Sequence, residues 1–110
     1  MLSSDVMRGY NDSIILSLLA EGDSYGYEIS RSIQERTGNA YSMRETTLYS
    51  AFNRLERLGY VSSYQGTETC GRKRTYCTIT PAGRAFVREK REEWTLLQQV
   101  INQFLREGNV

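Results

Sequence analysis

Apolar residues recur three or four positions apart in several stretches of the chain, which is the pattern of amphipathic helices. The stretch from Val6 to Ala20 predicts a first helix, ended by Glu21-Gly22-Asp23-Ser24. A second helix follows and stops at Thr37-Gly38-Asn39. Its buried stripe is marked by Tyr25, Ile29 and Ile33.

The third helix has the clearest start signal. Ser42-Met43-Arg44-Glu45 matches the capping box, in which Ser42 and Glu45 bond each other's free backbone N–H groups. Gly59 predicts its end. One side of the helical wheel carries Leu48, Ala51, Phe52, Leu55 and Leu58; the other carries Thr46, Ser50, Asn53 and Arg57, flanked by Tyr49 and Arg54.

A hairpin and a last helix complete the chain. Tyr60–Glu68 and Lys73–Ile79 are rich in Tyr, Thr, Val and Ile, with glycines between them, so we expect two strands and a longer loop. Thr80-Pro81 predicts a helix start, and the helix runs to about Glu107. The expected fold class is α+β, mainly α: a winged helix-turn-helix over residues 1–80 with a long C-terminal dimerisation helix over 81–110, forming one compact unit.

The polar face of the third helix suits DNA. Asparagine pairs with adenine, arginine with guanine or phosphate, and short hydroxyl side chains with either bases or phosphates. Any amphipathic surface helix looks similar, and a basic loop can merely be solvated. The three cations at the hairpin tip favour DNA, since phosphates would relieve their repulsion. We therefore expect DNA contacts from Tyr27, Thr46, Thr47, Tyr49, Ser50, Asn53, Arg54, Arg57, Arg72, Lys73 and Arg74.

The terminal helix is apolar over a wide arc from Trp94 to Leu105. Leaving its large side chains in water forfeits about 1.5–3 kcal/mol each, so we expect a homodimer in which this helix packs on its twin or on the partner's first helix. Trp94 is either a core anchor of that dimer or a stacking surface for a planar or cationic small molecule. Glu92, Glu93 and Gln98 are close enough in sequence to supply charge or hydrogen bonds to such a ligand.

Composition narrows the possible functions. The chain has 110 residues, 39% of them hydrophobic and 25% charged, as in one ordinary globular domain. A net charge of +1 gives no global case for nucleic acid. No segment looks like a membrane span or a secretory signal, so we expect a cytoplasmic protein. With no histidine, zinc is not expected, nor any other metal or cofactor; Cys70 and Cys77 are expected to be free thiols.

The chain resembles the PadR family of bacterial transcriptional regulators, in its short form with a single C-terminal helix. The resemblance is carried by stretches across nearly the whole chain: Ile14–Leu19, Gly22–Ile29, Thr47-Leu48-Tyr49, Arg54-Leu55-Glu56, Gly71–Tyr76 and Thr80–Gly83.

This resemblance implies a homodimeric winged-helix repressor that binds double-stranded DNA at an inverted repeat and dimerises through the terminal helix. It also implies a ligand site for planar drugs at the dimer centre, with Trp94 at the position of the stacking tryptophan. It further implies that Asn11 and Ser13 to Ile15 of the first helix help to line this site. With the neighbours of Trp94, the expected ligand residues are Asn11, Ile14, Ile15, Glu93, Trp94, Leu97 and Gln98, and the dimer contacts expected from burial are Met7, Tyr10, Trp94, Leu97, Ile101 and Phe104.

The chain departs from the family pattern at three positions. Ser50 stands where members usually have proline, Phe52 replaces leucine, and Cys70 lies at the expected wing tip. Two other classes of function stay open: a winged-helix protein–protein module without DNA binding, and a redox-sensing variant using the cysteines. An enzyme is not expected, because the chain has no histidine, nucleophile elbow, phosphate loop or convincing carboxylate cluster.

Overall fold

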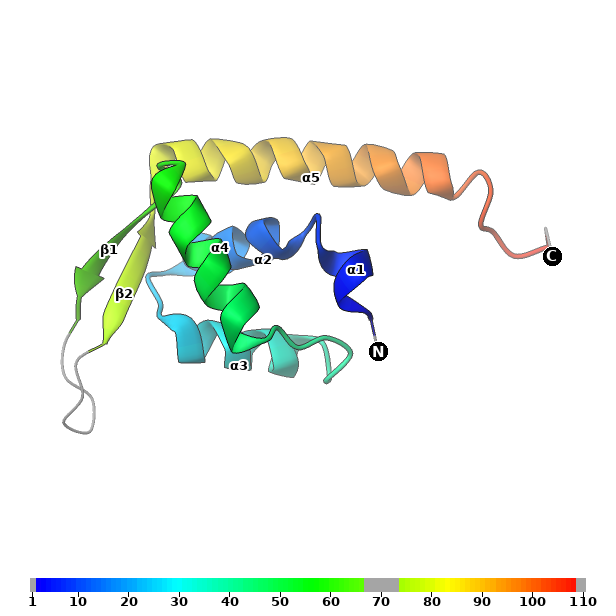
Figure 1. Cartoon of the computed structure of the whole chain (residues 1–110). Coiled ribbons are helices and arrows are strands. Elements are labelled where there is room, and N and C mark those ends of the chain that lie inside the picture. The colour runs from blue at the N-terminus through cyan, green and yellow to red at the C-terminus, as the bar shows by residue number, and fades with distance from the viewer. Residues whose placement is uncertain (1, 67–73, 109–110) are drawn as a thin grey trace.

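The computed structural model describes residues 2–66 and 74–108 and shows five helices and a two-stranded antiparallel sheet within them. In Figure 1, α5 runs along one side, α3 lies on the opposite side, and the hairpin projects from one end. The expected class, a mainly helical winged helix-turn-helix, is confirmed. The elements are α1 (Ser4–Met7), α2 (Asn11–Glu21), α3 (Gly26–Arg36), α4 (Glu45–Arg57), β1 (Val61–Gln65), β2 (Thr75–Ile79) and α5 (Pro81–Ile101).

The single first helix predicted from Val6 to Ala20 is wrong, because α1 ends at Met7 and α2 begins at Asn11. Gly9, a weak helix former, lies in the break. The Tyr10 N–H donates to the Met7 carbonyl oxygen (2.9 Å), a tight turn that keeps the apolar spacing nearly helical across the interruption. A periodic pattern alone could not reveal the break.

The predicted capping box is also wrong. α4 begins at Glu45, and its N-cap is Arg44, in extended conformation with no side-chain cap bond. Tyr41 and Met43 are buried, so this connection is held extended by core packing. The predicted end is confirmed, since Gly59 follows the helix with φ +80°. Leu58, expected on the apolar side, is 53% exposed because it follows the last helical turn.

The hairpin pairs Val61 with Ile79 and Gln65 with Thr75. Both strands are shorter than predicted: Tyr60 precedes β1, and the predicted strand residues Glu68 and Lys73 lie outside the described residues. Ser24 adds a one-residue bridge to the other edge of β2, where its backbone exchanges two hydrogen bonds with Cys77 (2.8 and 3.2 Å).

The predicted start of α5 is confirmed. The Gly83 N–H donates to Thr80 Oγ1 (3.1 Å), and Pro81 occupies the first helical position. The predicted end at Glu107 is wrong: α5 ends at Ile101, and the cap is Asn102, a weak helix former. The residues that follow make turns, with the Leu105 N–H donating to the Ile101 carbonyl oxygen (2.9 Å).

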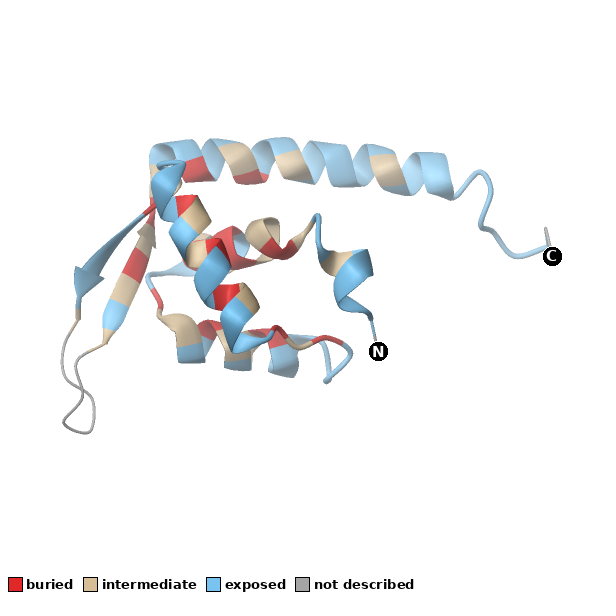
Figure 2. Cartoon of the chain, viewed as in Figure 1, coloured by how far each residue is buried: buried red, intermediate tan, exposed pale blue. Residues whose placement is uncertain are grey.

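The core forms where α2 meets the other helices and the base of the hairpin, as the buried segments in Figure 2 show. Cys77 is part of this core as a free thiol, as expected, and burial raises its pKa; Cys70 lies outside the described residues. No helix in the described part of the chain is long and apolar enough to cross a membrane. The largest fully buried side chains are Ile15, Leu16, Leu19, Ile29 and Leu55.

Candidate nucleic-acid interface

Helix α4 turns a polar face outward from an apolar base. Its buried residues are Leu48, Ala51 and Leu55, which anchor it on the core. Among the predicted contact residues, Thr47 and Arg54 are half-buried. The exposed ones are Thr46, Tyr49, Ser50, Asn53 and Arg57. The structure therefore places the candidate base-reading side chains together on one accessible helix face.

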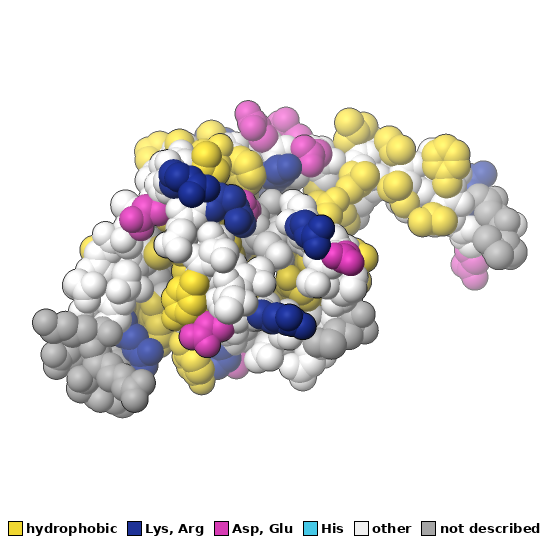
Figure 3. Space-filling model, viewed as in Figure 1, with side chains coloured by type: hydrophobic (Ala, Val, Ile, Leu, Met, Phe, Trp, Pro, Cys, Tyr) yellow, Lys and Arg dark blue, Asp and Glu magenta, His cyan; other side chains and the backbone are white. Residues whose placement is uncertain are grey.

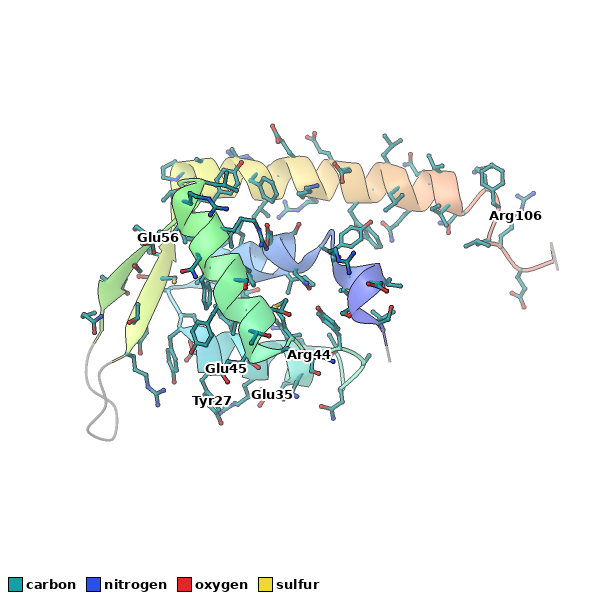
Figure 4. The ribbon with its side chains drawn as sticks, viewed as in Figure 1. Tyr27, Glu35, Arg44, Glu45, Glu56 and Arg106 are labelled. Atoms are coloured by element: carbon teal, nitrogen blue, oxygen red, sulfur yellow. The ribbon has the colours of Figure 1, made fainter. Side chains whose placement is uncertain are left out.

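Arg44 is a candidate contact that sequence reasoning missed. It is exposed at the N-cap of α4, next to Glu45, as Figure 4 shows. The misplaced capping box put Arg44 inside the first helical turn, where its side chain had no evident role. Because α4 spans Glu45–Arg57, Arg44 and Arg57 lie at opposite ends of the helix.

Three cations near α4 and the hairpin lack an acidic partner. Arg44, Arg57 and Arg74 form no ion pair with any described residue. Figure 3 shows basic side chains at several separate places on the face that α4 crosses, with acidic side chains among them. A cation without an acidic neighbour attracts phosphates more strongly. Ion pairs elsewhere in the molecule are Arg8–Asp5, Arg31–Glu35, Arg36–Glu21 and Lys90–Glu93.

The described part of the wing holds Arg74 on an aromatic stack. The Arg74 guanidinium lies 4.8 Å from the centre of the Tyr25 ring, and Tyr25 packs edge-on against Tyr76 (5.2 Å). Arg74 Nε is buried and has no hydrogen-bond partner among the described residues. The other two predicted wing cations, Arg72 and Lys73, lie outside those residues.

The base of the wing is tied to the α2–α3 connection through a carboxylate. The Tyr64 hydroxyl donates to Asp23 Oδ2 (2.7 Å), and Tyr64 stacks on Tyr76. This hydrogen bond, helped by one from Thr78, lowers the pKa of Asp23 and keeps it charged, while it raises the pKa of Tyr64. The wing therefore meets the body at a fixed contact.

The start of α3 lies beside α4. A Cβ atom on Gly26 would lie 3.4 Å from Tyr49 Oη and 3.6 Å from Leu48 Cδ2, so the close approach at this glycine is to side chains of α4. Tyr27, the next residue and another predicted contact, is 61% exposed and forms a side-chain hydrogen bond with Arg31.

Arg54, another predicted contact, is held from inside the protein. Its Nε and Nη2 donate to the two carboxylate oxygens of Asp12 on α2 (3.0 and 2.5 Å). The same hydrogen bonds raise the pKa of Arg54. The two residues are 42 positions apart, so no local pattern indicated this pair.

A largely apolar hollow of about 670 Å³ lies between α1, α2, α3 and α5, with Arg36, Lys90 and Arg91 among its lining residues. Of the predicted ligand residues, Ile14 and Trp94 line it. Ile15 is fully buried in the core, and Asn11 is buried with its Oδ1 accepting from the Tyr41 hydroxyl (2.5 Å). Glu93, Leu97 and Gln98 lie on α5 and do not line the hollow. Six residues that define its walls are Val6, Met7, Tyr10, Ile14, Val87 and Trp94.

The predicted dimer residues fall into two groups. Met7, Tyr10 and Trp94 line the hollow, where Trp94 packs edge-on against Tyr10 with 5.6 Å between ring centres. Leu97, Ile101 and Phe104 lie farther along the chain, where Figure 3 shows hydrophobic side chains exposed along the free end of α5. Trp94 itself is 47% exposed, at the junction of the two groups.

Comparison with known proteins agrees with this architecture. The PadR-like family of transcriptional regulators matches residues 15–89. A transcriptional regulator from Clostridium thermocellum is 58% identical, with a TM-score of 0.87 over 94% of this chain and 100% of that one. A PadR family transcription regulator from Clostridium difficile is 36% identical, with a TM-score of 0.76 over 89% and 100% of the chains.

Among curated proteins, an uncharacterized protein of Lysinibacillus sphaericus is 44% identical over 105 residues, which is 96% of each chain. The family match over most of the winged helix and the similarity to the PadR family regulator from Clostridium difficile confirm the resemblance inferred from the sequence. The chain belongs to the PadR-like family of transcriptional regulators, which are DNA-binding proteins.

Proposed function

We propose that this protein is a homodimeric repressor that binds an inverted-repeat operator and is released by a planar or cationic small molecule at the dimer centre. The single observation that carries the DNA part is the exposed polar face of α4, with Arg44 and Arg57 unpaired among the described residues. Such a face suits the major groove, with base contacts from Ser50 and Asn53. The wing, through Arg74 and its neighbours, would contact phosphates or the minor groove.

The terminal helix supports a homodimer. Past Trp94, α5 and the turns after it expose a series of large apolar side chains that a second protomer would cover. Covering each side chain would gain about 1.5–3 kcal/mol. In a two-fold symmetric dimer, each protomer would contact α5 of its partner. The same symmetry would place the two α4 helices at two half-sites of the DNA. The exposed residues are Leu96, Val100, Ile101, Phe104 and Leu105.

The hollow also supports a ligand site. Trp94 presents part of its ring there, and aromatic rings attract planar and cationic molecules. Ser13 Oγ is buried with no hydrogen-bond partner among the described residues, and Ser13 lines the same hollow. A ligand that fits one arrangement of the dimer better than the DNA-bound arrangement would lower DNA affinity.

DNA binding is tested with a duplex that the wild-type protein selects from a random pool, measured by fluorescence anisotropy across a salt series. We expect Arg57→Ala to weaken binding on every sequence and to reduce the salt slope by about one for each phosphate that is no longer neutralised. Arg106→Ala is the matched control, because Arg106 lies at the far end of the chain from α4 (Figure 4). No selected sequence and no binding at low salt would indicate a protein–protein module instead.

Ligand binding is tested through Trp94, the only tryptophan. Titration with a planar cationic dye that does not itself bind duplex DNA should quench its emission and lower affinity for the selected duplex. The Trp94→Leu variant should keep DNA binding and lose the response of DNA affinity to the dye. Quenching without any change in DNA affinity would contradict release by ligand.

A further inference from the structure

The pair between Asp12 and Arg54 joins the core helix α2 to the recognition helix α4. Asp12 accepts from both Nε and Nη2, so the carboxylate grips one edge of the planar guanidinium at two points. The pair is partly shielded, with 24% of the Asp12 side chain and 42% of the Arg54 side chain exposed. A two-point contact fixes the plane of the guanidinium as well as its position.

The grip leaves the outer end of Arg54 available. A guanidinium carries five N–H donors, and Asp12 engages two of them, so both N–H groups of Nη1 and one of Nη2 remain. These are the donors of the end-on edge, the edge that can bond guanine O6 and N7 together. Arg54 follows Asn53 directly and lies one turn from Ser50 and from Arg57, on the border of the exposed face.

The segment of α2 that carries Asp12 is itself anchored in the core. Asn11, the residue before Asp12, is buried and accepts a hydrogen bond from the Tyr41 hydroxyl in the connection between α3 and α4. The first turn of α2 therefore contacts the helix-turn-helix at two successive residues. Asp12 is attached to a fixed part of the core and not to a mobile surface segment.

We propose that Asp12 is a positioning residue for sequence recognition, which holds Arg54 with its free edge toward the base pairs. The inference rests on the proposed function, in which α4 enters the major groove. An unsupported arginine must lose its rotamer freedom on reaching a base, whereas Arg54 is ordered beforehand. The charge of Asp12 also offsets that of Arg54, so Arg54 attracts phosphates less. Asp12 thus raises the preference for the operator over other DNA while reducing affinity for DNA in general.

The test compares wild type with Asp12→Asn on the selected duplex and on a scrambled duplex of the same composition. Asparagine has nearly the same shape as aspartate, but its side chain has only one oxygen that can accept a hydrogen bond. We expect the ratio of the two affinities to fall by about tenfold, within the range of one bidentate base contact, while affinity for the scrambled duplex holds or rises. Asp5→Asn is the matched control, because it removes the same charge from an exposed pair with Arg8, and should leave the ratio unchanged.

Two further variants separate positioning from damage to the fold. Arg54→Lys keeps the charge without the two-point grip and should lower the ratio to the same degree. In an Arg54→Ala background, Asp12→Asn should have no further effect on the ratio. An unchanged ratio in Asp12→Asn, equal losses on both duplexes, or an effect that persists without Arg54 would overturn the proposal. If the wild-type protein selects no sequence, the proposed function itself fails and this inference fails with it.

Discussion

Gly83, in the first turn of α5, lies against the backbone that leads into β1. A Cβ atom there would lie 2.3 Å from the Tyr60 carbonyl oxygen and 2.8 Å from Ile79 Cγ1. The oxygen is fixed, because it accepts a hydrogen bond from the Thr80 N–H (3.0 Å). Hence no side chain fits at this position without moving the hairpin or α5.

We expect Gly83→Ala to lower the free energy of unfolding by about 1–3 kcal/mol, the usual cost of forcing extra atoms into a packed site. Urea denaturation followed by circular dichroism measures the change. Gly9→Ala is the control, since no atom lies within 4 Å of a Cβ there. Equal stability of the two variants would contradict this prediction and show that the junction of α5 and the hairpin can rearrange to accommodate a Cβ atom.

Single residues also show where prediction from sequence stops. The exposure of Ser50, Asn53 and Arg57 was predictable, because a helical wheel orders side chains by local spacing. The grip of Asp12 on Arg54 was not, since it joins residues far apart in the chain. The role of Arg54 therefore could not be separated from that of its neighbours before the structure.

At the scale of elements, the signals that worked were local ones: a side chain bonded to nearby backbone, or a glycine with positive φ. Thr80 begins α5 through a local hydrogen bond, and Gly59 follows the end of α4 with a positive φ. Both predictions are confirmed. Ser42 carried the same kind of signal and failed, because burial of Tyr41 and Met43 holds that segment extended. Tertiary packing outweighs a cap worth about 1 kcal/mol.

The ends of helices without strong caps were the other weak point. The break between α1 and α2 and the end of α5 both fall inside apolar patterns that continue past them. Periodicity shows which side chains share a face, but past Trp94 the apolar residues Leu96, Val100 and Ile101 of α5 remain exposed. The pattern along α5 is therefore better explained by a contact between molecules than by the length of the helix.

For the whole molecule, shape and exposed surface both favour the proposed dimer. The protein extends over 56 Å but measures only 29 and 21 Å across, and α5 reaches well past the body in Figure 1. A lone domain of this size has little core to spare for stabilising an exposed apolar helix. In a symmetric dimer, each protomer would cover exposed apolar side chains on α5 of the other.

We expect Ile101→Glu to be monomeric at micromolar concentrations where wild type is dimeric, because a carboxylate at a buried apolar contact loses its hydration. Sedimentation equilibrium gives the dissociation constant. Gln99→Glu is the matched control, as it adds the same charge two positions away on a polar, exposed residue. An unchanged dimer in Ile101→Glu, or a monomeric wild type, would contradict the proposed interface.

The first turn of α2 contacts both α4 and the apolar hollow. Asp12 holds α4, while Ser13 and Ile14, the next two residues, line the apolar hollow. If a molecule in the hollow weakens DNA binding through this turn, thermodynamic reciprocity requires the operator to weaken that molecule's binding by the same factor. The operator-bound protein would then need a higher effector concentration than the free protein to reach the same occupancy of the hollow.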